Sequence, residues 1–164
     1  ADEDNIPFFW WEEMGWLTMC NGSVIDYEEP VKWFLAMKKM GFKIKLVGYD
    51  RRYSREFVLK MKKAGFKVVD QPQRYVEKTE AFREIENKSI EGKYYYCHNK
   101  AHEYCIENVK AIEDSDDFVR FEKIQPNLRI DLFDADVIAT KQMLKDIEKS
   151  QRAGEWFGEE KKHE

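Results

Sequence analysis

The sequence predicts an α/β domain: a mixed sheet with helices on both faces, in which crossover helices join parallel strands. The main observation is a repeat, because residues 37–44 (Met-Lys-Lys-Met-Gly-Phe-Lys-Ile) are echoed by residues 61–68 (Met-Lys-Lys-Ala-Gly-Phe-Lys-Val). Each unit has the form of a helix end, a glycine stop and a strand, and consecutive units of this kind favour parallel strands. The second observation is that the apolar run at 44–49 ends at Asp50, so we expect the strand before Asp50 to be central.

The first unit of the repeat is the most clearly marked. Apolar residues such as Val31 and Phe34 fall at helical spacing, which predicts a helix over 28–40. Gly41 fits the position just after a helix end. The apolar run that follows predicts a strand over 42–49.

The other elements follow from the same rules of periodicity and turn chemistry. In chain order, we expect a short strand at 16–20 with a turn at 21–22, a helix at 77–90, a strand or extended segment at 93–98, a helix at 102–109, strands at 110–113 and 118–122, and a helix at 131–150.

Composition limits the classes of protein that fit. A length of 164 residues with 43% hydrophobic and 15% aromatic content suits one folded domain. The net charge of −4 gives no overall basic field, so any nucleic-acid contact must use a local basic patch. No apolar stretch has the length of a membrane span, and we expect no secretory leader. Cys20, Cys97 and Cys105 lack disulfide-scaffold spacing, which favours a reducing cytoplasm.

The domain is predicted to cover residues 1–150, with a charged C-terminal tail at 151–164. The chain starts with Ala1-Asp2-Glu3-Asp4-Asn5 and has no initiator methionine, so we expect a fragment of a longer polypeptide.

Three carboxylates are the candidate metal ligands. Asp50 follows an apolar strand, and Asp131 opens the last predicted helix. Asp134 lies one turn further on, so Asp131 and Asp134 should point roughly the same way. Carboxylate oxygens suit Mg²⁺ or Mn²⁺, and a pair of such ions can hydrolyse phosphodiesters. The alternative is that Asp131 and Asp134 only stabilise the amino end of the helix, where negative charge is favourable.

Arginines adjoin the first of these carboxylates. Arg51, Arg52 and Arg55 follow Asp50 directly and are candidates for contact with DNA phosphates. The alternative is a solvated charged surface shared with Glu56.

Two further patterns are weighed against simpler explanations. Cys97, His98, His102 and Cys105 supply zinc-type ligands, but adjacent side chains diverge on an extended backbone, and closed sites prefer gaps of two to four residues. Zinc is therefore not favoured. The run Tyr94-Tyr95-Tyr96 could stack on bases, although a packed strand explains it equally well.

The order of motifs along residues 5–145 resembles the nuclease domain of the large terminase subunit of tailed bacteriophages. Each motif alone is weak, but several in the right order are fairly specific. The motifs are Asn5-Ile6-Pro7 with the tryptophans and glycines up to Asp26, Val47-Gly48-Tyr49-Asp50-Arg51, Gln71, Glu84, Gly92, His98-Asn99, Asn108, Lys123, Arg129-Ile130-Asp131 and Ala135.

The resemblance implies an RNase H-like fold and metal-dependent cutting of packaged viral DNA. It assigns the second family carboxylate to Asp50 and the last to Asp131, which would be catalytic and hold two Mg²⁺ or Mn²⁺ ions, with Asp134 as an additional ligand. Nothing matches the family's first metal-binding aspartate, since Asp2 and Asp4 do not follow an apolar strand. The expected domain therefore lacks its first strand and is N-terminally truncated.

The same resemblance implies partners and a location. The partners are double-stranded DNA, the phage portal, the small terminase subunit and an upstream ATPase domain of the same polypeptide, with no membrane. The location is the cytoplasm of the infected bacterial host, transiently at the procapsid portal. The alternative function is a catalytically silent module that docks on the portal or on DNA through the charged tail, which contains Trp156-Phe157.

Overall fold

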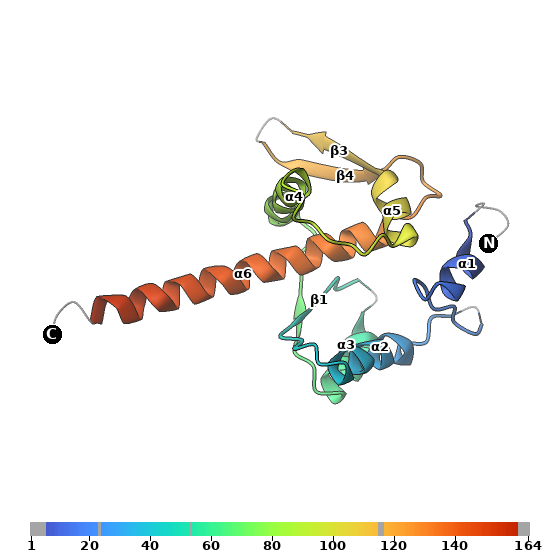
Figure 1. Ribbon diagram of the computed structural model, residues 1–164, viewed down its shortest axis with the longest axis horizontal. Helices are drawn as coiled ribbons and strands as arrows, with labels where there is room; N and C mark the ends of the chain where they lie inside the picture. Colours follow the sequence, from blue (N-terminus) through green and yellow to red (C-terminus); the bar gives the residue numbers. More distant parts are fainter. Residues whose placement is uncertain (1–5, 23, 53, 115–116, 161–164) are drawn as a thin grey trace.

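The computed structural model describes residues 6–22, 24–52, 54–114 and 117–160. A long C-terminal helix, α6, crosses the molecule, with one group of elements on each side, and its far end projects beyond them (Figure 1). The elements are α1 (Phe8–Glu13), α2 (Glu28–Lys39), β1 (Val47–Tyr49), α3 (Arg55–Lys63), β2 (Val68–Asp70), α4 (Tyr75–Ile90), α5 (Lys100–Glu107), β3 (Val109–Glu113), β4 (Val119–Lys123) and α6 (Asp131–Glu160). None of the described helices is long and apolar enough to cross a membrane.

The repeat forms a parallel pair of strands, as predicted. β1 and β2 are aligned with Val47 opposite Val68 and Tyr49 opposite Asp70. The helices α2 and α3 cover one face of this sheet and bury an apolar cluster with it, centred on Met61. On the opposite face lies α6, which contacts β1 (Figure 1). The predicted α/β class, with helices on both faces of a sheet, is therefore confirmed for this pair of strands.

Gly48 allows β1 to approach α6 very closely. A Cβ atom at this position would lie 2.5 Å from Ile138 Cγ2 and 3.2 Å from Gln142 Cγ. Atoms at the first of these distances overlap, so any side chain larger than hydrogen would push the strand and the helix apart.

A buried pair of amides holds the same junction. Gln71, which follows β2 and is 1% exposed, accepts a 2.5 Å hydrogen bond at Oε1 from Gln142 Nε2 on α6. Its backbone N–H donates to the Tyr49 carbonyl at 2.8 Å. Since buried polar groups must be paired, these two contacts fix the carboxyl ends of both strands against α6.

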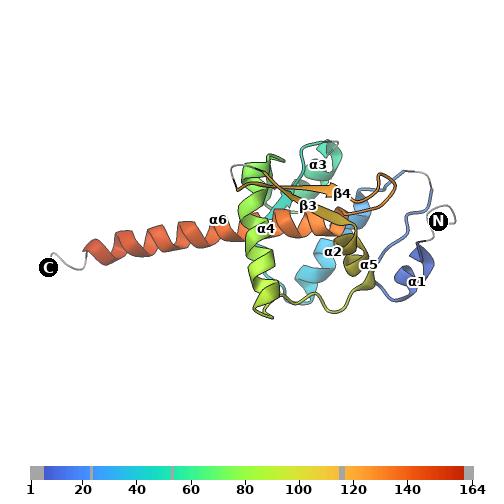
Figure 2. The same ribbon diagram turned by 90° about the horizontal axis from the view of Figure 1, so that it is seen from above.

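The other side of α6 carries the second core. The helices α4 and α5 pack on the amino-terminal half of α6, and α4 crosses it (Figure 2). The antiparallel hairpin β3–β4 packs on α4 and reaches α6 through the contact of Phe121 with Phe133. The core contains Ala81, Cys105, Phe133 and Val137, so α6 is buried at Phe133 and Val137.

Several predicted elements differ from the structure. The four described strands form two separate pairs, not one mixed sheet, because β3 and β4 bond to each other and not to β1. In this part of the chain β1 is therefore not flanked by strands on both sides. The strand predicted at 42–49 is restricted to Val47–Tyr49, and the last helix runs beyond residue 150, to Glu160.

The strand predicted at 16–20 does not form, and residues 93–98, predicted as a strand or an extended segment, form no strand. Both segments contact helices. Residues 17–20 have no regular structure, because Met19 donates its N–H to Glu12 Oε1 of α1 and Trp16 packs edge-on against Trp10. Residues 93–98 form a connection between α4 and α5, and left-handed backbone at Cys97 and His98 ends any extended run there. The helix α1 was not anticipated.

Gly48→Ala should reduce the free energy of unfolding by about 1–3 kcal/mol, the usual cost of overpacking a filled core. Combining it with Ile138→Ala should cost less than the sum of the two single changes, because the clash partner is removed. Urea denaturation of the four proteins measures this coupling. Strictly additive losses would show that Gly48 and Ile138 do not share a contact.

Candidate functional site

The carboxyl ends of β1 and β2 carry an acidic residue each. Asp50 follows β1 and Asp70 ends β2, next to Tyr49 in the strand register. Asp50 is half-buried, and its Oδ1 accepts the Arg52 backbone N–H at 2.9 Å. Arg51 Nη2 lies 2.5 Å from Asp70 Oδ2, so this arginine is held across the strand ends. The loop after β1 is therefore fixed with the Asp50 carboxylate at the edge of the sheet.

The direction of β1 relative to α6 is set by two contacts. Lys45, before the strand, forms a 2.7 Å ion pair with Asp146 on α6. Three residues later Gly48 faces Ile138 and Gln142, which lie nearer the amino end of the helix. The strand and the helix therefore run antiparallel, and β1 points toward the start of α6.

Asp131 lies where β1 points. It precedes Ile138 by seven residues, which is about two helical turns, so both residues share the stripe of α6 that faces β1. Asp131 is exposed and sits roughly 10 Å beyond Ile138, while Asp50 extends up to about 7 Å beyond Gly48 in the same direction. Both predicted catalytic residues thus lie past the same end of the β1–α6 contact. No hydrogen bond or ion pair joins them in the described chain.

Asp134 has a different environment from Asp131. Its Oδ1 lies 2.5 Å from Nζ of Lys78 on α4, and the Lys78 side chain is only 11% exposed. Lys78 is therefore a buried cation. The pair holds the Asp134 carboxylate against α4. That Asp131 points roughly the same way stays a prediction.

The donor set that the structure provides fits a hard divalent cation but is incomplete. Asp50 and Asp131 offer carboxylate oxygens, the ligands that Mg²⁺ and Mn²⁺ prefer. Among the described residues no three His, Cys, Asp or Glu side chains are grouped so that they could hold a metal ion. A complete site needs at least one further ligand beyond these two.

The three predicted DNA-binding arginines are not equivalent. Arg51 forms an ion pair with Asp70, but its side chain is 83% exposed. Arg52, just after Asp50, and Arg55, at the start of α3, are exposed and form no ion pair with any other described residue. Arg52 and Arg55 are thus the members of this group whose charge has no counter-charge in the described part of the chain.

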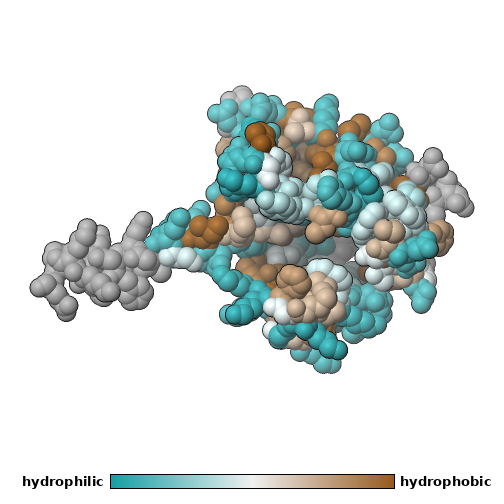
Figure 3. Space-filling view, in the orientation of Figure 1, coloured by the Kyte–Doolittle hydropathy of each residue, from teal (hydrophilic) through white to brown (hydrophobic). Residues whose placement is uncertain are grey.

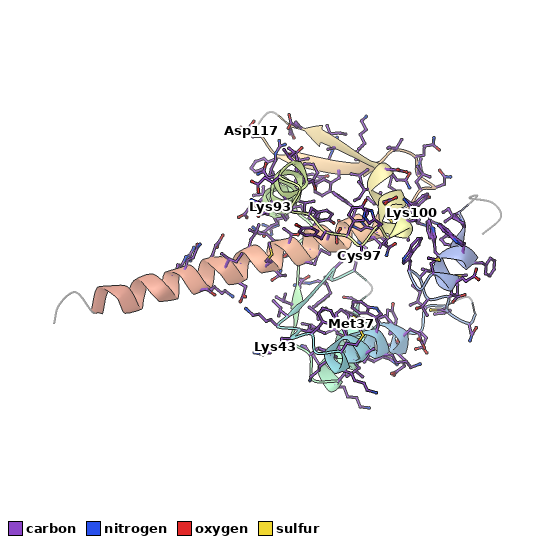
Figure 4. The ribbon with its side chains drawn as sticks, viewed as in Figure 1. Met37, Lys43, Lys93, Cys97, Lys100 and Asp117 are labelled. Atoms are coloured by element: carbon purple, nitrogen blue, oxygen red, sulfur yellow. The ribbon has the colours of Figure 1, made fainter. Side chains whose placement is uncertain are left out.

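The residues of the zinc pattern are divided between two places. His102 and Cys105 are buried on α5, whereas Cys97, labelled in Figure 4, and His98 are exposed on the preceding connection. Among the described residues they are not grouped as three or more ligands of one metal ion. His102 Nε2 instead contacts Asp136 Oδ2 of α6.

The tyrosine run contacts the same two residues, His102 and Asp136. Tyr94 donates a 2.5 Å hydrogen bond to Asp136 Oδ2, and burial together with this bond raises the pKa of Tyr94. The Tyr94 and Tyr96 rings stack near the imidazole of His102, while Tyr95 is 85% exposed. Two of the three tyrosines therefore pack inside the protein, and only Tyr95 remains open to a base.

Sequence reasoning overlooked Asp70 and the Gln71–Gln142 bridge. Asp70 was accessible to prediction, because it follows the second repeat unit as Asp50 follows the first. The glutamine pair joins residues 71 positions apart in the chain, and no local pattern announces such a contact.

Comparisons with known proteins agree on one family. The family model described as "Terminase large subunit, endonuclease domain" matches residues 1–146. A crystal structure of the HK97 bacteriophage large terminase superposes with a TM-score of 0.73 and 20% sequence identity, covering 86% of this chain. The match spans 30% of the HK97 chain. No curated protein matches the sequence.

Asp134→Asn should lower the free energy of unfolding by about 1–2 kcal/mol, because it leaves the buried Lys78 ammonium without its counter-charge while Asp134 itself is about one-third exposed. Asp131→Asn should cost less, since its side chain is exposed. Thermal denaturation of the two variants gives the comparison. Equal losses would mean that the Lys78 pair does not contribute to stability.

Proposed function

Since the chain belongs to the family of terminase large-subunit endonuclease domains, we propose that it cuts concatemeric double-stranded viral DNA by divalent-metal-dependent phosphodiester hydrolysis. The observation that supports this most directly is the antiparallel packing of β1 on α6. It puts Asp50 and Asp131, which come from distant parts of the chain, past the same end of one contact.

In this proposal each residue near the strand ends has a separate task. Asp50 and Asp131 supply carboxylate ligands to two Mg²⁺ or Mn²⁺ ions, and Arg52 and Arg55 hold the DNA phosphate. When bound, the ions provide water activation and stabilisation of the leaving oxygen for in-line attack. Arg51, paired with Asp70, keeps the loop that carries Asp50 in place. Asp134 contributes a further oxygen only when its ion pair with Lys78 opens.

The third ligand is proposed to come from an upstream strand, which completes an RNase H-like sheet. In the parallel ladder Val47 and Tyr49 bond to the β2 segment, so the N–H and C=O of Gly48 point to the opposite edge. No strand of the described chain occupies that edge. A groove of about 720 Å³ runs along it between α2 and α6, with Trp33, Val47 and Met143 among its lining, and apolar residues border this hollow in Figure 3. An added strand would satisfy the free backbone groups of Gly48 and fill the groove.

The remaining partners follow from the same proposal. An upstream ATPase domain of the polypeptide, the small terminase subunit and the phage portal are the expected assembly, and the site of action is the host cytoplasm, transiently at the procapsid portal. The fact that the chain spans 30% of the HK97 large terminase is consistent with further domains in the intact subunit.

A docking role is the second candidate. The backbone of α6 remains helical to Glu160 and projects well beyond both cores (Figure 1), as an element that reaches a partner would. A docking module has no need for carboxylates at the end of β1 and the start of α6, so the nuclease proposal is preferred.

Asp50→Asn or Asp131→Asn in the full-length subunit should reduce plasmid cleavage at least about 100-fold, because each change removes a ligand that stabilises transition-state charge by several kcal/mol. ATP hydrolysis should be unchanged. The matched control is Glu148→Gln, which removes an exposed carboxylate from the same helix far from Asp131 and makes no contact with β1, so this variant should cut normally.

Chelation of divalent metal should abolish cleavage by the unmodified protein, and Mn²⁺ or Mg²⁺ should restore it. The 164-residue chain alone should cut poorly, and extension upstream should recover cleavage. Normal cutting by both aspartate variants would overturn the site assignment. Loss of portal binding on truncation of α6, with no cleavage in any extended protein, would favour docking instead.

A further inference from the structure

The sequence repeat brings two lysine-rich segments to one end of the β1–β2 sheet. The helices α2 and α3 pack side by side, and a short segment (40–46 and 64–67) joins each to the following strand of the parallel pair, so their carboxyl ends lie toward the same end of the sheet. This is the end opposite Asp50. The six exposed lysines of the two segments, here called the lysine face, are Lys38, Lys39, Lys43, Lys62, Lys63 and Lys67.

The lysine face has no counter-charges of its own in the described chain. Lysines elsewhere, such as Lys78, Lys100 and Lys141, form ion pairs with nearby carboxylates. No member of the lysine face forms an ion pair with a described residue, and Lys38 instead lies 5.9 Å from the Phe66 ring centroid. In a chain with a net charge of −4, six unpaired cations on one surface are a local exception.

The surface between the two segments is hollowed. A depression of about 320 Å³ is lined by Lys38, Lys43 and Lys45 together with Gly41 and Gly65, the glycines that end α2 and α3. Figure 4 labels Lys43 at this end of the lower group of elements. The absence of side chains on both glycines leaves room for a ligand atom to approach the lysines.

Favourable interaction with the helix ends explains only some of the lysines in the lysine face. Lysines in the last turn of α2 and α3 interact favourably with the helix dipole. Lys43 and Lys67 lie beyond the helix ends, in the segments that lead into the strands, where that effect is lost. The remaining chemistry suits an external polyanion, because lysine ammonium groups act as point charges that need no fixed orientation.

We propose that the lysine face binds the phosphate backbone of duplex DNA, as a second contact separate from the cleavage edge. This inference deepens the proposed function, since it rests on the chain acting on DNA. Lys43 precedes Asp50 by seven residues, at most about 23 Å of extended chain, which is less than one turn of duplex. One DNA molecule can therefore reach both ends of the sheet. An acidic protein surface is the competing partner.

The test compares two variants of the 164-residue chain that carry the same charge. One replaces Lys39, Lys43, Lys62, Lys63 and Lys67 by Gln. The matched control replaces five exposed lysines elsewhere, Lys93, Lys100, Lys110, Lys123 and Lys149, by Gln. Both variants change the net charge by five, from −4 to −9. Fluorescence anisotropy with a random-sequence duplex, in EDTA so that no cleavage occurs, gives the affinity at several salt concentrations.

The lysine-face variant should bind at least about tenfold more weakly than the unmodified chain, and the slope of log K against log salt should fall by about 3–4. The control variant should keep most of the affinity and most of the salt slope of the unmodified chain. Equal weakening of the two variants would show a net-charge effect only, and unchanged binding in both would favour an acidic protein partner. Either result overturns the proposal.

Lysine acetylation of the unmodified chain provides a measurement that does not depend on the variants folding. Duplex DNA should protect Lys39, Lys43, Lys62, Lys63 and Lys67 and leave Lys110 and Lys123 reactive. Reactivity of the lysine face that does not change with DNA would contradict the proposal. Because the anisotropy assay runs in EDTA and measures binding alone, it does not depend on the metal ligands, so a failure of the lysine face is distinguishable from a failure of the catalytic assignment.

Discussion

The contact between Gly48 and α6 is the constraint on which the rest of the structure depends. The strand lies so close to the helix that the methyl group of an alanine at position 48 would overlap with Ile138. The buried Gln71–Gln142 hydrogen bond fixes the same junction. Because α6 also carries the second core, through Phe133 and Val137, this one contact relates the parallel sheet to the hairpin and its helices. Loss of the close approach would separate the two halves and move Asp50 relative to Asp131.

The same geometry divides the sheet into two functional ends. At the carboxyl end the chain offers Asp50, with Arg52 and Arg55 exposed near it in the sequence, and Asp131 at the start of α6. At the amino end, the repeat supplies cations without carboxylate partners in the described chain. In the proposed mechanism the first end performs hydrolysis and the second holds the duplex, which explains how a chain of net negative charge could bind DNA.

The extent to which the sequence predicted this arrangement depends on the range of the interactions. The helices α2 and α4 and the β1–β2 pair were predictable, because periodicity and glycine stops are local signals. The strand predicted at 16–20 does not form, since this segment contacts α1 and not a neighbouring strand. The ion pair of Asp134 with Lys78 was not predicted, because the two residues lie 56 positions apart in the chain. Motifs in the sequence were enough to name the candidate ligands. Their positions relative to one another could be inferred only from the packing of Gly48 on α6.

The most direct test of the central claim is anomalous scattering from crystals of the upstream-extended chain soaked in Mn²⁺. If Asp50 and Asp131 share a metal site, the anomalous density should lie between their carboxylates, with a third ligand from a strand added at the open edge of β1. Strong manganese density bound elsewhere, with nothing between Asp50 and Asp131, would contradict the account.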